Sequence, residues 1–416
     1  MAQKMGRGFS GQDFGGGVMV DAILVINAGS SSIKFALYDT SAKGRLTTIA
    51  HGQIEGIGTA PHLLVHDAQQ AVLAERYWPV GETHTHEDLL DPLLRLIEQE
   101  LSGVALCAVG HRVVHGGETY FRPARVDAAL IEALAKLTPL APLHQPHNLA
   151  AISAIAALRP GLPQIACFDT GFHHGIAPVV SRLALPRHFA EEGVRRYGFH
   201  GLSYEFIARA LAACAPALAQ GKVIAAHLGN GASLCAMDAG QSVDTTMGFT
   251  ALDGLVMGTR TGSIDPGAVL YLMQQHGLDA AAIEDVLYHR SGLLGVSGVS
   301  ADMRDLLASR DPHAKEAVEL FVFRCAREMG ALMTSLGGLD GIVFTAGIGE
   351  HAPDIRAAVA ARLAFLGLVL DRAANDQPTT GPRLISATES RVALWVIPTD
   401  EEAMIAEHTR TSVADS

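Results

Sequence analysis

Short apolar runs alternate along the chain with segments in which apolar residues recur every three or four positions. The first pattern predicts strands and the second predicts helices. The predicted strands are Ile23–Ile26, Ile33–Tyr38, Ala105–Val114, Gln164–Phe168, Val223–His227, Ser233–Met237, Gly341–Thr345 and Arg391–Ile397. The predicted helices are Asp127–Leu137, Asn148–Leu158, Ser203–Cys214, Ala314–Leu336 and a last one from Glu401. This alternation favours a layered α/β fold.

One strand–turn–strand unit occurs twice, 200 residues apart. VINAGSSSIKFALYD begins at Val25 and AAHLGNGASLCAMD begins at Ala225, so that Asn27 aligns with His227 when Gly29 is set against Gly229. Either two hairpins are alike by chance, or the chain contains a duplicated domain. In a duplicated protein the two hairpins would face each other across a cleft, and such a cleft is a natural site for a nucleotide.

The length of 416 residues is too great for one ordinary core, so we expect two domains. The glycine-rich residues 1–20 are expected to form a flexible N-terminal tail, and they lack the pattern of a signal peptide. We expect an N-terminal domain at residues 21–170 and a C-terminal domain at residues 171–399. The final helix, residues 400–416, is expected to pack back on the first domain, because chain ends often lie close together.

The chain is acidic, with 31 Lys and Arg residues against 43 Asp and Glu residues and a formal net charge of −12. Binding to nucleic acid requires a basic surface, so this partner is not expected, whereas a local basic pocket for a small anion stays possible. No apolar run approaches the roughly 18 residues of a membrane helix. The five cysteines form no CxxC pair, which favours buried thiols in a cytoplasmic protein over disulfides or structural zinc.

Three turns are rich in small residues that would let backbone N–H groups approach an anion. They are Asn27–Ser32, with Lys34 two residues further on, His227–Gly231, and Gly347–Glu350 ahead of a helix start at Pro353. GxxxxGK[ST] does not occur, and GxGxxG occurs only at residues 6–11, in the glycine-rich N-terminal segment and not after a predicted strand, so neither common phosphate-loop motif is supported. Each turn taken alone is also explained by ordinary turn chemistry.

Two arginines stand near apolar or glycine-rich segments, Arg112 in GHRVVHGG and Arg260 in MGTRTG. A cation beside an apolar wall needs an anionic partner, which is either a carboxylate and a phosphoryl group of substrates or an internal Asp or Glu. His200, in RRYGFHG, is either a donor to a developing negative charge or a structural histidine. The close histidine pairs form no HExxH motif and have no cysteine at zinc spacing, which disfavours a transition-metal site.

The segment TDEE opens the last predicted helix. Thr399 and Glu402 have the spacing of a capping box, which would account for both side chains. Glu401 is then left over, and its carboxylate could help to hold Mg²⁺ through water.

Eight segments, in this order, resemble the acetate kinase family of the acetate and sugar kinase/heat-shock chaperone/actin superfamily. They are INAGSSSIKF, GHRVVHGGE, CFDTGFH, RRYGFHGLS, AHLGNGASL, MGTRTG, FTAGIGE and TDEE, and the resemblance covers residues 23–402. It implies an α/β fold of two domains with a duplicated actin-like (ribonuclease H-like) core, an active site in the interdomain cleft, and a homodimer. It also implies reversible transfer of the ATP γ-phosphoryl group to acetate, giving acetyl phosphate and ADP, with Mg²⁺ as the metal and Mn²⁺ as the alternative.

The resemblance further implies roles for individual residues. The metal would be positioned by Asn27 and Glu401. The nucleotide would be bound by Lys34, His227, Leu228, Gly229, Asn230, Gly231, Asp302, Met303, Arg304, Gly347, Ile348, Gly349, Glu350 and His351. Arg112 would bind the carboxylate of the acyl substrate, in a pocket formed by Val114, Leu143, Phe199 and Ala251. His200 and Arg260 would stabilise the transition state, and Asp169 would be the catalytic acidic residue. Because acetate is already an anion, orienting Arg112 or a metal-bound water is an alternative role for Asp169.

Several positions depart from the family pattern. After His144 the family usually has Asn-Pro-Pro-Asn, where this chain has Gln145-Pro146-His147-Asn148, so that Gln145 and His147 differ. Ser263 replaces an Asp, and His351 replaces an Asn. Ala251 replaces a common proline in the acyl pocket, and one methylene there discriminates by only about 1–3 kcal/mol. A propionate or other short-chain acyl kinase is therefore the nearest alternative. A nucleotide switch without phosphoryl transfer and a metal hydrolase are the alternatives from other classes.

Overall fold

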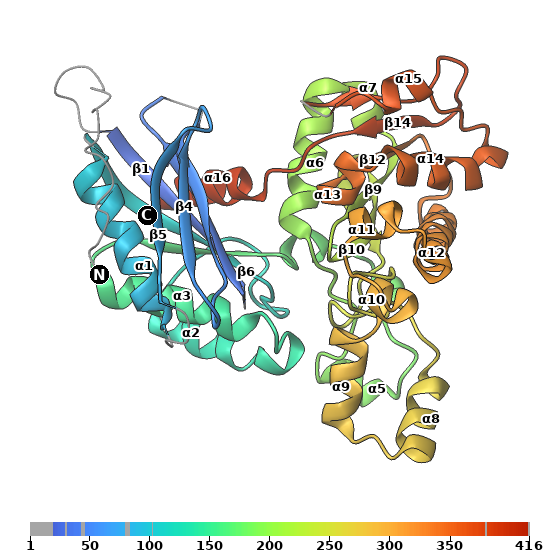
Figure 1. The fold of residues 1–416 in the computed structure, drawn as a ribbon, viewed down its shortest axis with the longest axis horizontal. Helices are drawn as coiled ribbons and strands as arrows, with labels where there is room; N and C mark the ends of the chain where they lie inside the picture. The colour runs from blue at the N-terminus through green and yellow to red at the C-terminus, as the bar shows by residue number, and fades with distance from the viewer. Residues whose placement is uncertain are drawn as a thin grey trace.

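The computed structural model describes residues 20–29, 31–42, 46–79, 84–101, 103–378 and 381–414. Within them the chain folds into two lobes, each built on one mixed sheet with helices on its faces (Figure 1). The predicted α/β class is thereby confirmed, whereas residues 1–19 of the expected tail, and Ser30 of the first turn, lie outside the described residues. In the part of the chain described, no helix combines the length and the apolar character needed to span a membrane.

The first sheet has the strand order β5-β4-β3-β2-β1-β6-β8-β7. Its strands are β1 (Val20–Ala28), β2 (Ser32–Asp39), β3 (Thr47–Glu55), β4 (His62–Asp67), β5 (Val72–Tyr77), β6 (Val104–Val113), β7 (Ala124–Arg125) and β8 (Gln164–Phe168). Alternate side chains of a strand point to opposite sides of the sheet, and β1 is covered by helices on both sides. Leu24 packs towards helices α1 (His86–Arg95) and α3 (Gln145–Leu158), and Ile23 packs towards α16 (Glu401–Ala414). Figure 1 shows α16 lying with this lobe, although the chain enters it from the other one.

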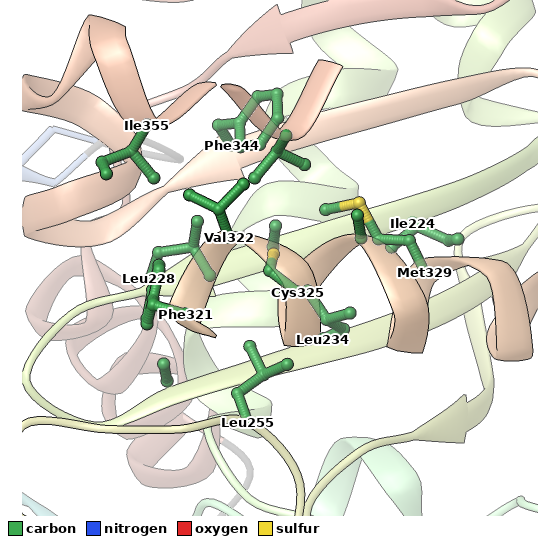
Figure 2. Close-up of a cluster of buried hydrophobic side chains, with 14 of the residues drawn as sticks. Ile224, Leu228, Leu234, Leu255, Phe321, Val322, Cys325, Met329, Phe344 and Ile355 are labelled. Atoms are coloured by element: carbon green, nitrogen blue, oxygen red, sulfur yellow. The ribbon is translucent and has the colours of Figure 1, made fainter. Parts of the chain in front are cut away.

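The second sheet has the order β11-β10-β9-β12-β14-β13. Its strands are β9 (Lys222–Leu228), β10 (Ala232–Asp238), β11 (Gln241–Thr245), β12 (Gly341–Thr345), β13 (Arg383–Leu384) and β14 (Ala393–Val396). Helix α6 (Gly201–Cys214) packs on the face that carries Val223 and Ala225. On the opposite face, Ile224 and Leu234 pack against Phe321 and Cys325 of the long helix α12 (Pro312–Leu336) (Figure 2). These layers form the larger apolar core of the molecule.

The two sheets repeat one topology. In both β3-β2-β1-β6-β8 and β11-β10-β9-β12-β14, the first three strands are antiparallel and the last three are parallel. The hairpin β1–β2 of the first sheet corresponds to the hairpin β9–β10 of the second. This agreement of order and direction favours a duplication over a chance likeness of two hairpins.

The remaining helices lie mostly in the second lobe. They are α2 (Ala128–Ala135), α4 (Pro178–Ser181), α5 (Arg187–Glu191), α7 (Pro216–Ala219), α8 (Pro266–His276), α9 (Ala280–His289), α10 (Gly292–Ser297), α11 (Met303–Ala308), α13 (Ala346–His351), α14 (Pro353–Arg362) and α15 (Arg372–Asn375). Every strand and helix predicted above is present, with ends that differ by a few residues. Strands β3 to β5, which the apolar pattern did not predict, extend the first sheet at one edge.

Candidate active site

A cavity of about 580 Å³ is lined by residues from both lobes. It brings together most of the residues that the sequence nominated: Asn27, Lys34, Arg112, Val114, Asp169, Phe199, His200, His227, Gly229, Asn230, Gly231, Arg260, Gly347, Glu350, His351 and Glu401. The hairpins β1–β2 and β9–β10 both contribute, so the repeated turns open on one shared space. The lining also includes Ala251 and four residues that were given no role in binding or catalysis, namely His144, Ala346, Thr399 and Glu402.

Seven nominated residues do not line this cavity. They are Leu143, Leu228, Asp302, Met303, Arg304, Ile348 and Gly349. Leu228 is fully buried in the second core. The Arg304 side chain is 89% exposed and pairs with Asp302, whose carboxylate caps helix α11. If these residues contact a nucleotide, they therefore contact a part of it that lies outside this cavity.

Arg112 is held by an internal carboxylate. It follows the buried run of β6, and its Nη2 donates to Asp169 Oδ2 at 2.6 Å while its Nε donates to both carboxylate oxygens at 3.0 and 3.1 Å. Arg112 Nη1 lies 3.6 Å from Glu401 Oε2. Burial alone would lower the pKa of Arg112, but the charges of Asp169 and Glu401 outweigh it and raise the pKa. The guanidinium is thus permanently charged and fixed in direction, with 20% of its side chain still accessible.

Arg260 stands in a different environment. Its guanidinium donates from Nη1 to the Ala251 carbonyl oxygen at 3.1 Å, and among the described residues no carboxylate forms an ion pair with it. Burial lowers the pKa of Arg260, and the charge of Arg112 acts in the same direction. A half-buried cation without a carboxylate is costly, so this position favours an anion from outside the chain.

Three histidines in the lining are neutral near pH 7. Burial, with the charges of Arg260 and Arg112, lowers the pKa of His144 to about 3. Burial together with Arg112 lowers the pKa of His227 to about 3, and burial is also the largest cause of a pKa of His200 well below its ordinary value. These imidazoles can donate a hydrogen bond through one ring nitrogen without adding a charge to the site.

Backbone strain is concentrated at the same place. Among the described residues, four non-glycine residues have a positive φ, and two of them, His200 (φ 59°) and Ala346 (φ 63°), line the cavity. Such a conformation costs about 1–3 kcal/mol and is typical of functional sites. Gly231 completes this tight arrangement, because a Cβ atom there would lie 3.4 Å from His200 Nε2. The turn backbone and the imidazole therefore face each other closely.

The capping box predicted for Thr399 and Glu402 is wrong. Asp400 Oδ1 accepts the Ala403 N–H at 2.8 Å and so caps α16, while the Thr399 N–H is bound by Glu350 Oε1. Glu402 instead lines the cavity, and burial raises the pKa of its carboxyl group. Spacing along the chain identified the helix start but not the side chain that caps it.

The predicted open glycine turn after β12 is also different in the structure. Residues Ala346–His351 form the short helix α13, with Gly347 at the cavity and Gly349 beneath it against the backbone of Phe344. The buried Arg356 fixes this segment by donating to the carbonyl oxygens of Gly349 and Glu350 at 2.9 and 2.8 Å.

Oxygen donors for a hard cation are present in the lining. Asn27 Oδ1 and Glu401 Oε2 lie near the same atom, Arg112 Nη1, at 3.3 and 3.6 Å. Among the residues described, no group of three or more His, Cys, Asp or Glu side chains is arranged to hold a metal by itself. One amide oxygen and one carboxylate suit Mg²⁺, which keeps several waters and takes further ligands from substrate phosphates.

Two positions that depart from the family pattern, Gln145 and Ser263, make hydrogen bonds within the site wall, as does the neighbouring Asn148. Gln145 Nε2 donates to the His115 carbonyl oxygen and its Oε1 accepts the His115 N–H. Asn148 links the strand end at Val114 to the first turn at Ala28, with distances of 3.0 and 2.7 Å. Ser263 Oγ donates to Asp253 Oδ1 at 2.7 Å. The wall that carries Val114 is thus fixed to the first hairpin.

Comparison with known proteins identifies the family. The model of the acetokinase family matches residues 22–407. An acetate kinase of Rhodopseudomonas palustris is 54% identical over 392 residues, which cover 94% of this chain and 98% of that protein. Two solved structures, an acetate kinase of Porphyromonas gingivalis and a propionate kinase of Francisella tularensis, are 36% and 35% identical, with TM-scores of 0.83 and 0.85. They cover 94% of this chain, and this chain covers 100% and 99% of theirs. The fold, the shared cavity and these matches agree, and the chain belongs to the acetokinase family.

Proposed function

We propose that the protein is a kinase that transfers the γ-phosphoryl group of ATP to acetate, reversibly, giving acetyl phosphate and ADP. The observation that carries this proposal is Arg260, a half-buried cation without a carboxylate partner among the described residues, in one cavity with the fixed cation Arg112. Two such cations suit a substrate carboxylate and a phosphoryl group. Near relatives with this activity support the same reaction class.

In the proposed reaction, a carboxylate oxygen of acetate attacks the γ-phosphorus, and the bond from that phosphorus to the β,γ-bridging oxygen breaks as ADP leaves. Acetate needs no proton removed, so the chain contributes mainly alignment and charge stabilisation. Arg112 binds the acetate carboxylate, and Asp169 orients Arg112 and does not act as a base. Arg260 and the neutral imidazole of His200 donate hydrogen bonds to the transferred group, where negative charge is spread in the transition state.

The nucleotide phosphates would lie along the turn Gly229–Gly231, with Lys34 and Gly347 also in contact. Asn27 and Glu401 would hold Mg²⁺, or Mn²⁺ in its place. Bound there, the ion would neutralise charge on the β- and γ-phosphates. Asp302 to Arg304 would reach only a part of the nucleotide that extends beyond the cavity.

Changing Glu401→Gln should raise the Mg²⁺ concentration for half-maximal activity by roughly 10-fold or more, because a carboxylate ligand is lost. A Mg²⁺ titration of the initial rate measures this. Glu407→Gln is the matched control, since Glu407 lies on the same helix but pairs with Arg410 outside the cavity. An unchanged Mg²⁺ dependence in Glu401→Gln would remove Glu401 from the metal site.

The choice of acyl substrate is the open part of the proposal, since propionate is a possible substrate beside Ala251. Ala251→Pro should raise the acetate-to-propionate ratio of kcat/KM by roughly 10-fold, because the ring narrows the pocket by about one or two methylene groups. The Ala251 carbonyl oxygen that accepts from Arg260 is kept in this variant. The ratio is measured with acetate, propionate and butyrate, and no change in it would place Ala251 outside the acyl pocket.

Trapping of the acyl phosphate with hydroxylamine tests the reaction class. Wild-type protein should form a hydroxamate with acetate or propionate only when ATP and Mg²⁺ are both present. ATP turnover that is independent of added carboxylate would instead favour a nucleotide switch. Full activity with Mg²⁺ after removal of transition metals by a chelator is expected, and its loss would favour a metal hydrolase.

We further propose a homodimeric, cytoplasmic protein with a domain boundary near residue 170. The acidic net charge of −12 supports a protein that handles small metabolites and not nucleic acid. Light scattering combined with size-exclusion chromatography would test the dimer, with a mass of twice 43.8 kDa as the expected result.

A further inference from the structure

Two histidines of the cavity stack on each other, and each is held by one serine. The rings of His200 and His227 lie 4.1 Å apart with an angle of 17° between their planes. His200, which precedes α6, contacts Ser233 on β10 at 2.9 Å through Nδ1. His227, on β9, contacts Ser203 on α6 at 2.8 Å, also through Nδ1. His227 is therefore anchored by the helix that begins just after His200, and His200 is anchored by the strand that pairs with β9.

The contact of His200 continues into a buried chain of hydrogen bonds. Ser233 Oγ lies 2.5 Å from the hydroxyl of Tyr204, and both Ser233 and Tyr204 are completely buried. Among the described residues, Ser233 is the hydrogen-bond partner of the Tyr204 hydroxyl. The hydroxyl hydrogen of Tyr204 thus has one acceptor, Ser233, and would be buried without a partner if it pointed elsewhere.

This arrangement sets the donor and the acceptor of each hydrogen bond in the buried series. Tyr204 donates to Ser233, so the single hydrogen of Ser233 is free to go to His200. His200 Nδ1 is then an acceptor, and in a neutral imidazole the ring hydrogen must reside on Nε2. That nitrogen faces the turn at Gly231, where the proposed phosphoryl group would lie. The opposite tautomer would present a lone pair to phosphoryl oxygens and repel them.

We propose that Ser233 and Tyr204 are positioning residues that fix His200 as the Nε2–H tautomer, so that it donates to the transferred phosphoryl group. The catalytic part of this inference rests on the proposed function, whereas the tautomer itself does not. Groups behind a functional histidine set its tautomer and orientation in the same way in other sites, and their loss typically costs about 10–100-fold in activity.

The test combines nitrogen-15 NMR of the histidine side chains with steady-state kinetics. The chemical shifts of the two ring nitrogens report which one carries the hydrogen, and His200→Gln assigns the His200 signals among the 19 histidines. Wild-type protein should show neutral His200 with hydrogen on Nε2. In Ser233→Ala, a mixture of both tautomers is expected, with kcat lowered by about 10-fold or more and KM for acetate and ATP unchanged.

Tyr204→Phe keeps the buried ring and removes only the hydroxyl group. It should shift the tautomer populations and kcat in the same direction as Ser233→Ala. If Ser233→Ala folds poorly, Tyr204→Phe replaces it as the test variant. Ser242→Ala is the matched control, because Ser242 is also a buried serine bound to a histidine Nδ1, that of His173, at 2.8 Å. His173 does not line the cavity, so this variant should leave kcat and the His200 signals unchanged.

The inference is overturned if His200 keeps hydrogen on Nε2 in both Ser233→Ala and Tyr204→Phe, or if kcat stays at the wild-type value although the tautomers change. A general weakening of the structure would instead lower activity in Ser242→Ala as well. Failure of the proposed function would look different, since wild-type protein would then make no acyl phosphate while the NMR signals would still report the tautomer of His200.

Discussion

Arg260→Ala should lower kcat by about 10²-fold or more, as expected when a preorganised donor to a developing charge is removed. The reason is that Arg260 has no carboxylate partner among the described residues and lies in the cavity with Arg112 and His200. Its charge is therefore available to the transferred phosphoryl group. The rate of acyl phosphate formation at saturating ATP and acetate measures the effect.

The stability of two arginine variants separates this role from a structural one. Arg260→Ala should unfold at the wild-type temperature or above it, because it removes a half-buried cation that has no carboxylate partner among the described residues. Arg112→Ala leaves the carboxylate of Asp169 buried without its partner and should cost about 3–5 kcal/mol of stability. Arg327→Ala, on the exposed side of α12, is the control for both measurements. Near-normal turnover in Arg260→Ala would exclude the proposed role.

Lowering the pH from 7 to 5 should destabilise the fold by several kcal/mol. His111, His115 and His173 are buried away from the cavity, and burial lowers the pKa of each to about 4. In the unfolded chain their pKa is about 6.5, so below this pH the unfolded state binds more protons than the folded state. Stability is full above pH 6.5 and is lost as the pH falls towards 4, by about 2 kcal/mol for each histidine at pH 5.

Denaturant unfolding at a series of pH values measures this dependence. His111→Gln removes one of the three groups, so the number of protons taken up on unfolding near pH 5 should fall by about one relative to wild type. Stability that does not change between pH 7 and pH 5 would mean that these histidines are not buried in the neutral form.

The core of the fold could be predicted from the sequence because its strands are buried throughout. Strand β8 is buried at all five positions and β9 at all but its first, which gives the continuous apolar runs from which they were predicted. In β3 only two of nine positions are fully buried, and β5 has none. Antiparallel strands of this kind keep part of their side chains in solvent, so they lack the continuous apolar run that identifies a buried strand.

The candidate site could be predicted only as a set of segments. The repeat and the family motifs nominated Arg112, Asp169 and Arg260, but they could not say which arginine has an internal partner. That distinction depends on the pairing of β6 with β8, which places Arg112 against Cys167 and brings Asp169 within reach. The capping box failed for a similar reason, because local spacing does not reveal that Glu402 faces a cavity formed by distant elements.

The central claim is that an oxygen of the acetate carboxylate becomes bonded to the transferred phosphorus, between the two arginines. Acetate labelled with oxygen-18 in its carboxylate tests this most directly. Hydroxylamine attacks the carbonyl carbon of acetyl phosphate, so the released phosphate should carry one oxygen-18 atom, and the rate at which labelled phosphate forms should fall with kcat in Arg260→Ala. Unlabelled phosphate from the wild-type reaction would contradict the account.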